Sequence, residues 1–358
     1  MARKLNFGAG PSQLPLPVLE RAAQEMLNYH DSGMSVLELS HRSVLYESLH
    51  NQAIADLRSL LGISEEFSVL FTQGGARMQF DAVPLNLATR FPVGNYLVSG
   101  YWSDMAEVWA RKYTRTQAIP YSNDSTLWNC GSPGYFYYCS NETIDGVEWL
   151  PSAADLQSVS SLAIVADMSS NILTTPIPCS SLGVFFAGAQ KNLGPAGVTV
   201  SVVRKDLLGS AQSFAPSLLD WQLLDQQNSM YNTPPTYMIY MLGLYLDYVK
   251  KQGGVQSFYE ESVRKSGAIY EVVDSSQGFY TSRVPRARRS RVNIPLSIRN
   301  GDAALEKEFL LQSERRGMIQ LAGHKSAGGL RVSLYNGISE ADTQQLADFM
   351  REFAAEHC

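Results

Sequence analysis

One lysine, Lys191, follows a short apolar run and is surrounded by small residues. Residues 184–187 predict a buried strand, 194–197 a glycine- and proline-rich turn, and 198–203 a second apolar strand. An amine at a strand end between two buried strands is poorly solvated, which favours its neutral, nucleophilic form. The nearest cations along the sequence lie beyond the second strand. The pattern fits a nucleophilic amine, although a surface lysine in a hairpin loop would leave the same pattern.

A candidate phosphate site lies earlier in the chain. Gly74 and Gly75 follow the apolar run 67–72 and precede a helical pattern that extends to Leu87. Glycines let backbone N–H groups point at an anion, and the helix N-terminus adds partial positive charge. Such glycine pairs are also common as plain turns, and the spacing fits neither the dinucleotide nor the nucleoside-triphosphate motif. The ligand class that remains is a small phosphorylated molecule.

Three more side chains stand where predicted strands end. Trp102 closes the run 96–102 and is either a core residue or a flat surface for an aromatic cofactor ring. Thr143 follows a strand at 135–138. Asp167 comes directly after four apolar residues, where a buried carboxylate needs a cation or a proton donor. A protonated pyridine nitrogen would meet that need.

Strands alternate with helices from residue 16 to about 250, which predicts an α/β fold with a mostly parallel sheet covered on both faces. Ligands of such sheets bind outside the carboxyl ends of the strands. Arg77, Trp102, Thr143, Asp167 and Lys191 all fall at such ends. Together they provide an amine that can form an imine, a carboxylate for a ring nitrogen, an aromatic side chain for stacking and a phosphate-binding site. Pyridoxal 5′-phosphate requires this set.

Composition excludes several classes of function. A chain of 358 residues predicts two domains. The net charge of −5 argues against a general nucleic-acid binder, although five arginines crowd residues 283–291. No apolar run reaches membrane-spanning length and the N-terminus lacks the apolar core of a signal peptide, so we expect a cytoplasmic protein without a membrane partner.

Cysteines and histidines show no metal-ligand spacing. We expect the four cysteines to be reduced thiols and no metal to be bound. These residues are Cys130, Cys139, Cys179 and Cys358, with His30, His41, His50, His324 and His357.

Several longer segments follow one another along the chain in an order typical of one enzyme family. They include Asn6-Phe-Gly-Ala-Gly-Pro11, Ser40-His-Arg-Ser43, Gly74-Gly-Ala-Arg77, Asn141-Glu-Thr-Ile-Asp-Gly146, Ala166-Asp-Met-Ser-Ser-Asn171, Phe186-Ala-Gly-Ala-Gln-Lys-Asn192, Tyr231-Asn-Thr-Pro-Pro-Thr236 and Gly323-His-Lys-Ser-Ala-Gly-Gly-Leu-Arg331. Through these segments the chain resembles, over almost its full length, the phosphoserine aminotransferases, which are class V aminotransferases of fold type I.

The resemblance implies a large cofactor-binding domain at 16–254 with a mostly parallel seven-stranded sheet, and a smaller α+β domain from 1–15 and 255–358. It also implies a homodimer with shared active sites. The implied reaction transfers the amino group of L-glutamate to 3-phosphohydroxypyruvate, giving O-phospho-L-serine and 2-oxoglutarate in serine biosynthesis. The longer phosphorylated keto acid of vitamin B6 synthesis is a second possible acceptor.

Site roles follow from the same resemblance. Lys191 binds the cofactor covalently, Asp167 pairs with its pyridine nitrogen, Trp102 stacks on its ring and Thr143 hydrogen-bonds the ring hydroxyl. The implied phosphate ligands are Ala76, Arg77 and Gln190, with Asn232 and Thr233 from a second subunit. The implied substrate ligands are His41, Arg42, His324 and Lys325 for the phosphate and Arg331 for the α-carboxylate.

One residue departs from the family pattern. The family usually has His-Arg where this chain has His324-Lys325. Lysine keeps the charge but lacks the planar fork that suits phosphate, so we expect weaker discrimination against non-phosphorylated analogues. Three alternatives stay open: a different class V aminotransferase, a related lyase or desulfurase with a reactive cysteine such as Cys130 or Cys179, and a non-catalytic protein that binds another phosphate.

Overall fold

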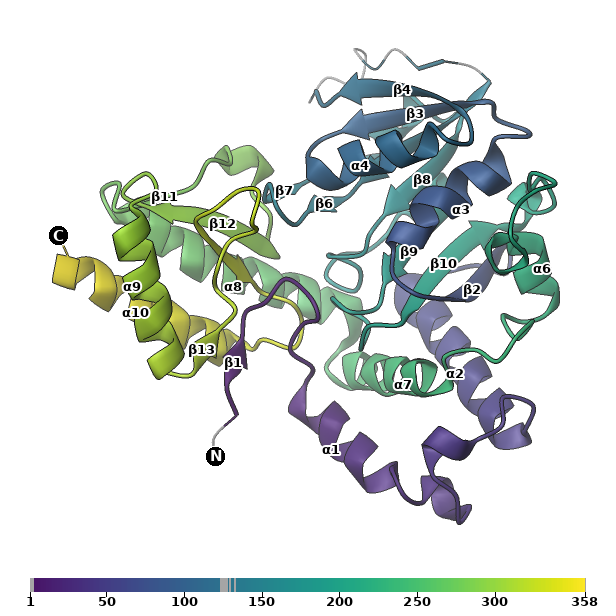
Figure 1. Ribbon diagram of the computed structural model, residues 1–358, viewed down its shortest axis with the longest axis horizontal. Coiled ribbons are helices and arrows are strands. Elements are labelled where there is room, and N and C mark those ends of the chain that lie inside the picture. The colour runs from purple at the N-terminus through teal and green to yellow at the C-terminus, as the bar shows by residue number, and fades with distance from the viewer. Residues whose placement is uncertain (1–2, 123–127, 129, 132, 358) are drawn as a thin grey trace.

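The large sheet is the centre of the fold (Figure 1). The computed structural model describes residues 3–122, 128, 130–131 and 133–357. Seven strands lie in the order β2-β10-β9-β8-β5-β3-β4, and all are parallel except β10, which runs antiparallel to β2 and β9. This confirms the predicted mostly parallel sheet. The strands are β2 (Phe67–Gln73), β3 (Val93–Val98), β4 (Arg115–Pro120), β5 (Gly134–Cys139), β8 (Ala163–Asp167), β9 (Val184–Gly188) and β10 (Val198–Arg204).

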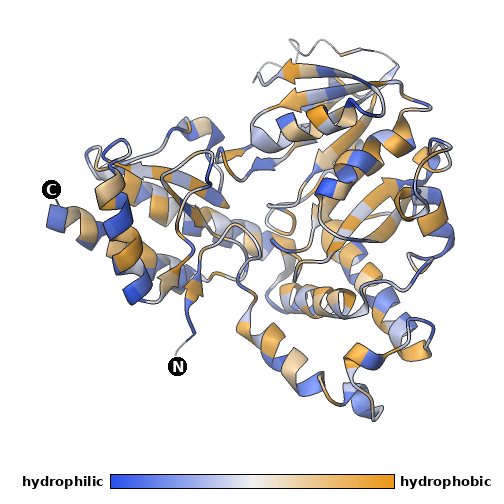
Figure 2. Cartoon of the chain, in the orientation of Figure 1, coloured by the Kyte–Doolittle hydropathy of each residue, from blue (hydrophilic) through white to orange (hydrophobic). Residues whose placement is uncertain are grey.

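Helices cover both faces of this sheet because successive strand residues point in opposite directions. Phe136 and Tyr138 of β5 pack on the side of α2 (Val44–Leu61), α5 (Ala153–Gln157) and α7 (Thr236–Lys251). Tyr135 and Tyr137 pack on the side of α3 (Arg77–Leu87), α4 (Tyr101–Ala110) and α6 (Trp221–Gln226). The central strands are accordingly hydrophobic along most of their length in Figure 2.

A second hydrophobic core lies beside the first. It is built from Phe7 and from residues between 269 and 353. Its elements are α8 (Gly254–Ser275), α9 (Ala303–Arg315), α10 (Glu340–His357) and a three-stranded sheet of β11 (Tyr280–Thr281), β12 (Asn293–Ile298) and β14 (Leu330–Ser333). The N-terminal strand β1 (Leu5–Asn6) joins this unit by pairing with β13 (Met318–Ile319), as Figure 1 shows. The domain limits at residues 15 and 254 stay a prediction.

Two smaller elements complete the frame. Helix α1 (Leu16–Glu25) packs through Val18 and Ala22 against α7. The hairpin of β6 (Asn141–Glu142) and β7 (Val147–Glu148) lies beside the N-terminal end of α4. Between β4 and β5, residues 123–127, 129 and 132 lie outside the described part of the chain. No helix among the described residues is long and apolar enough to cross a membrane.

Candidate active site

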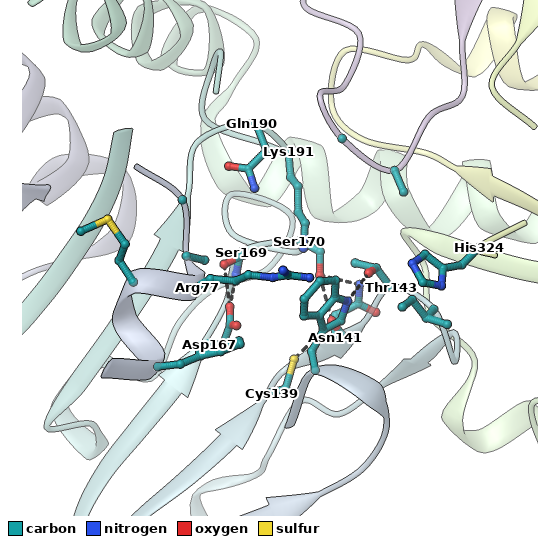
Figure 3. A pocket seen from close by; sticks show the side chains of 18 of the residues that line it. Arg77, Cys139, Asn141, Thr143, Asp167, Ser169, Ser170, Gln190, Lys191 and His324 are labelled. Atoms are coloured by element: carbon teal, nitrogen blue, oxygen red, sulfur yellow. Dashed lines mark hydrogen bonds between the residues drawn. The ribbon is translucent and has the colours of Figure 1, made fainter. Parts of the chain in front are cut away.

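A cavity of about 460 Å³ lies at the carboxyl ends of β5, β8 and β9. It is lined by nine of the predicted site residues, which are Ala76, Arg77, Trp102, Thr143, Asp167, Gln190, Lys191, His324 and Arg331. Figure 3 shows Lys191 and Arg77 pointing into it from different elements, with Asp167 and Ser169 together at one end and His324 at the other. The fold therefore brings these nine predicted side chains together in one cavity.

Lys191 and Asp167 influence each other electrostatically. Burial lowers the pKa of Lys191, Asp167 opposes that shift, and the Arg331 cation reinforces it. Burial raises the pKa of Asp167, while Lys191 and hydrogen bonds from Ser169 oppose the rise. The sequence-based picture of an amine without charged neighbours is therefore wrong, because the fold brings Asp167 and Arg331 near it. The expected direction, toward a neutral amine, holds because desolvation is the largest influence.

Asp167 is held by one of its two carboxylate oxygens. Oδ1 accepts hydrogen bonds from Ser169 N–H at 2.9 Å and Ser169 Oγ at 2.6 Å. Ser169 Oγ in turn accepts from Gly188 N–H at 3.2 Å, which ties the carboxylate to the end of β9. No described residue donates to Oδ2. Asp167 as a whole is only 6% exposed, yet it lines the cavity, where its second oxygen is free to accept a hydrogen bond from a ligand.

Trp102 faces the cavity from the first turn of α4. Its Nε1 donates to Thr143 Oγ1 at 2.7 Å, which leaves the Thr143 hydroxyl proton free for a ligand. Lys191 Nζ lies 5.8 Å and the Arg77 guanidinium carbon 5.2 Å from the indole centroid. The sequence placed Trp102 at the end of a strand. That was wrong, because β3 ends at Val98 and α4 begins at Tyr101.

The expected phosphate seat is the N-terminus of α3. Its N-cap residue, Ala76, provides no side-chain hydrogen bond, and the backbone N–H groups of Ala76 and Arg77 have no acceptor among the described residues, so both are available to an anion. The side-chain amide of Gln190 lines the cavity beside this helix end, and its Nε2 is a donor that suits a phosphate oxygen. Gly188 allows these groups to approach, since a Cβ there would lie 2.7 Å from Gln190 Oε1 and 3.2 Å from Ala76 N. The seat therefore fits a phosphate group.

Five predicted residues do not line this cavity. His41 and Arg42 lie just before α2, and Asn232 and Thr233 just before α7. Arg42, Asn232 and Thr233 are exposed. The resemblance assigned Asn232 and Thr233 to a second subunit, so their position leaves that expectation untested. Lys325 is also exposed and outside the cavity, whereas its neighbour His324 lines it and bonds Ser326 Oγ through Nδ1 at 2.7 Å.

The family model for class-V aminotransferases matches residues 4–346. The chain belongs to this family. It is 42% identical to a phosphoserine aminotransferase of Ralstonia pickettii, and the match covers 98% of this chain and 96% of that one. The phosphoserine aminotransferase structure from Bacillus circulans subsp. alkalophilus superposes with a TM-score of 0.94, 37% identity and 99% coverage of both chains. A PLP-bound phosphoserine aminotransferase from Trichomonas vaginalis gives 0.91 at 34% identity, covering 98% of this chain and 100% of that one. The resemblance to phosphoserine aminotransferases and the fold-type I architecture are confirmed.

Three residues that line this class-V aminotransferase site were not predicted from the sequence. Ser169, Cys139 and Asn141 all line the cavity. Ser169 could have been found, because a serine two residues after an aspartate commonly donates back to its carboxylate. Cys139 had no such signal, since its position beside Asp167 follows from the pairing of β5 with β8.

Neither cysteine proposed for a lyase or desulfurase lines this cavity. Burial raises the pKa of Cys130, and it raises the pKa of Cys179 to about 11, so both favour the unreactive thiol. Among the described residues, no group of three or more histidine, cysteine or acidic side chains could hold a metal ion.

Proposed function

We propose that this class-V aminotransferase moves the amino group of L-glutamate to 3-phosphohydroxypyruvate, giving O-phospho-L-serine and 2-oxoglutarate, with pyridoxal 5′-phosphate as cofactor. The observation that carries the proposal is one cavity lined by Lys191, Asp167 and Trp102 beside the uncapped N-terminus of α3. Relatives named phosphoserine aminotransferase, matched over nearly the whole chain, support the substrate class and the setting in serine biosynthesis.

Each part of pyridoxal phosphate has a fitting partner in this cavity. The phosphate would lie at the N-terminus of α3 with Ala76, Arg77 and Gln190, and the ring would lie against Trp102. The second oxygen of Asp167 would accept the pyridinium N–H. When bound, this cofactor supplies an aldehyde that captures the substrate amine and a ring that takes up the electrons released with the α-proton.

The side chains of the protein then have separate tasks. Lys191 Nζ would hold the cofactor and would serve as the general base for the proton on the α-carbon of glutamate. The same amine would return a proton to the α-carbon of the product. Asp167 would keep the ring nitrogen protonated, and Arg331 would bind the α-carboxylate of both substrates. Arg331 is already oriented by a 3.2 Å hydrogen bond from Nη1 to Thr143 O.

The homodimer belongs to this proposal because the phosphate-binding set is incomplete in one chain. His41, Arg42, Asn232 and Thr233 would reach the partner's cavity. Large apolar side chains are exposed close to these residues in the sequence, namely Leu27 (84%), Leu37 (54%), Val44 (81%) and Tyr231 (50%). Exposed apolar side chains of this size are frequent at interfaces between subunits. The free thiols of Cys130, Cys139 and Cys179 support a reducing compartment, and we propose the cytoplasm.

Mixing two inactive variants tests the shared site. We expect Arg42→Ala and Lys191→Ala each to be inactive alone. Refolding them together should restore activity, because one site of each mixed dimer would combine an intact Lys191 with the partner's intact arginine. Random pairing predicts about a quarter of the wild-type rate. The control is Lys191→Ala alone, refolded in the same way. If the mixture of the two variants recovers no activity, Arg42 acts in the site of its own chain.

Lys325→Arg tests the departure from the family pattern. We expect the ratio of kcat/KM for 3-phosphohydroxypyruvate over hydroxypyruvate to rise by about threefold to tenfold, because arginine offers a bidentate fork to phosphate. Steady-state kinetics with both keto acids measures this ratio, and Lys205→Arg is a control far from the cavity. An unchanged ratio would show that Lys325 does not contact the substrate phosphate.

The function itself is tested by kinetics with glutamate and two phosphorylated keto acids. We expect 3-phosphohydroxypyruvate to have the higher kcat/KM, with the longer keto acid of vitamin B6 synthesis as a slower acceptor. Binding of pyridoxal phosphate without amino transfer to either acid would contradict the proposed substrates while leaving the cofactor site intact.

A further inference from the structure

The N-terminus of α4, which carries Trp102, is capped by carboxylates from a turn about forty residues later in the chain. Tyr101 N–H donates to Asp145 Oδ2 at 2.8 Å, Trp102 N–H to Glu142 Oε2 at 2.8 Å and Ser103 N–H to Glu142 Oε1 at 2.9 Å. The first three backbone donors of a helix have no partners within the helix, so an outside acceptor must satisfy them. Glu142 satisfies two of the three.

Gly100 makes this arrangement possible. It stands directly before α4 and has no side chain with which to cap the helix. A Cβ at this position would lie 2.5 Å from Asp145 Oδ2 and 2.7 Å from Glu142 Cγ. Any larger residue would therefore displace the two carboxylates from the helix end.

Glu142 is an unusual acid because it is fully buried and has no cationic side chain in contact among the described residues. Its exposed fraction is 0%, and its remaining bond comes from Ser103 Oγ at 2.6 Å, with Ser99 Oγ farther off at 3.4 Å. Burial raises the pKa of this carboxyl to about 7, although the hydrogen bonds from Ser103 and Trp102 oppose the shift. The positive end of α4 is then its main source of charge stabilisation.

The same turn also holds the indole ring. Thr143, the residue after Glu142, accepts the hydrogen bond from Trp102 Nε1. The backbone and the ring of Trp102 are thus fixed by two consecutive residues of one turn. Moving this turn or the start of α4 would tilt the ring against the cavity.

We propose that Glu142 is a positioning residue for Trp102, and that its ionised carboxylate holds the start of α4 so that the indole presents its face to the cofactor ring. This inference rests on the proposed cofactor. Protonation of Glu142 would weaken its hydrogen bonds with the N–H groups at the start of α4. The indole ring of Trp102 would then be held less firmly. The affinity of the apoenzyme for pyridoxal phosphate would then fall as the pH drops through the range in which Glu142 titrates.

Other titratable groups near Glu142 must be separated from its effect. They are Asp145 on the same turn, Cys139 and Tyr137 on β5, and Lys191 after β9. The cofactor phosphate titrates as well. The ratio of dissociation constants between a Glu142 variant and wild type cancels contributions that both proteins share.

The experiment titrates apoenzyme with pyridoxal phosphate and follows the absorbance of the bound form. We expect Glu142→Gln to raise the dissociation constant about tenfold at pH 8.5, the usual scale for losing a helix cap, and the ratio to approach one at pH 6. Gly100→Ala keeps both acids but displaces them, so it should weaken binding in the same direction. Asp302→Asn is the matched control, because Asp302 caps α9 through Ala304 N–H and Leu305 N–H far from the cavity.

A second readout needs no cofactor. Subtracting the tryptophan emission of the Trp102→Phe apoenzyme from that of the wild-type apoenzyme isolates the emission of Trp102. We expect this difference to change with pH around a midpoint near pH 7, because the pKa of Glu142 is about 7. The change should be absent in Glu142→Gln. Thermal unfolding checks that the variants are folded. If Glu142→Gln does not fold, the affinity of Gly100→Ala for pyridoxal phosphate decides whether the carboxylates position Trp102.

Two results would overturn the inference. One is an unchanged dissociation constant in folded Glu142→Gln and Gly100→Ala. The other is a ratio that stays constant between pH 6 and 8.5. Failure of wild type to bind pyridoxal phosphate at all would instead contradict the proposed cofactor, so the two failures are distinguishable.

Discussion

Replacing Lys191 with alanine is expected to abolish amino transfer and to remove the visible absorbance of the lysine-bound cofactor. The rate should fall by at least about 10⁴-fold, because in the proposed function the same nitrogen provides both the covalent link to the cofactor and the general base for the α-proton. No other amine lines the cavity among the described residues. Steady-state rates and absorbance spectra of the purified variant, with added pyridoxal phosphate, measure both effects.

Lys205→Ala is a suitable control because Lys205 lies at the far end of β10 from Lys191. It should keep wild-type rate and spectrum. In wild type, borohydride should bleach the absorbance and leave the label on Lys191. Transamination that survives in Lys191→Ala, or a label on another lysine, would contradict the assignment.

The strand-end residues could be predicted because a parallel sheet gathers its carboxyl ends along one edge. Thr143, Asp167 and Lys191 were each predicted from a local pattern, and the pairing of neighbouring strands brought them together. Trp102 joins them from the first turn of α4 and not from a strand end. The antiparallel strand β10 does not change this arrangement, because it follows Lys191 and runs back along β9, away from the cavity.

Features that depend on distant partners could not be predicted in this way. The predicted run through Trp102 missed the start of α4, because the acids that cap it, Glu142 and Asp145, lie 40 and 44 residues after the N–H groups they bind. The charged neighbours of Lys191 could not be predicted from its own stretch of sequence, because Arg331 comes from β14, near the second core. His41 and Arg42 lie outside the cavity, just before α2, and their part in the site stays a prediction.

Asp167→Asn is the second substitution with a large expected effect. An amide can occupy the same space and keep the hydrogen bonds from Ser169, but it cannot neutralise a pyridinium. We therefore expect the cofactor to bind and kcat to fall on the order of 10²- to 10³-fold, the usual scale for removing one preorganised electrostatic group. Absorbance titration and steady-state kinetics separate the two effects.

The pH profile gives this prediction a further test. Burial raises the pKa of Asp167, so in wild type the carboxyl gains a proton as the pH falls and can no longer balance the ring charge. Activity of wild type should therefore decline on the acid side, and Asp167→Asn should lose that part of the decline because its amide does not titrate. Asp220→Asn, which alters the cap of α6, is the control. A kcat for Asp167→Asn close to that of wild type would mean that the ring nitrogen needs no anionic partner, and the cofactor would then have to lie elsewhere in the cavity.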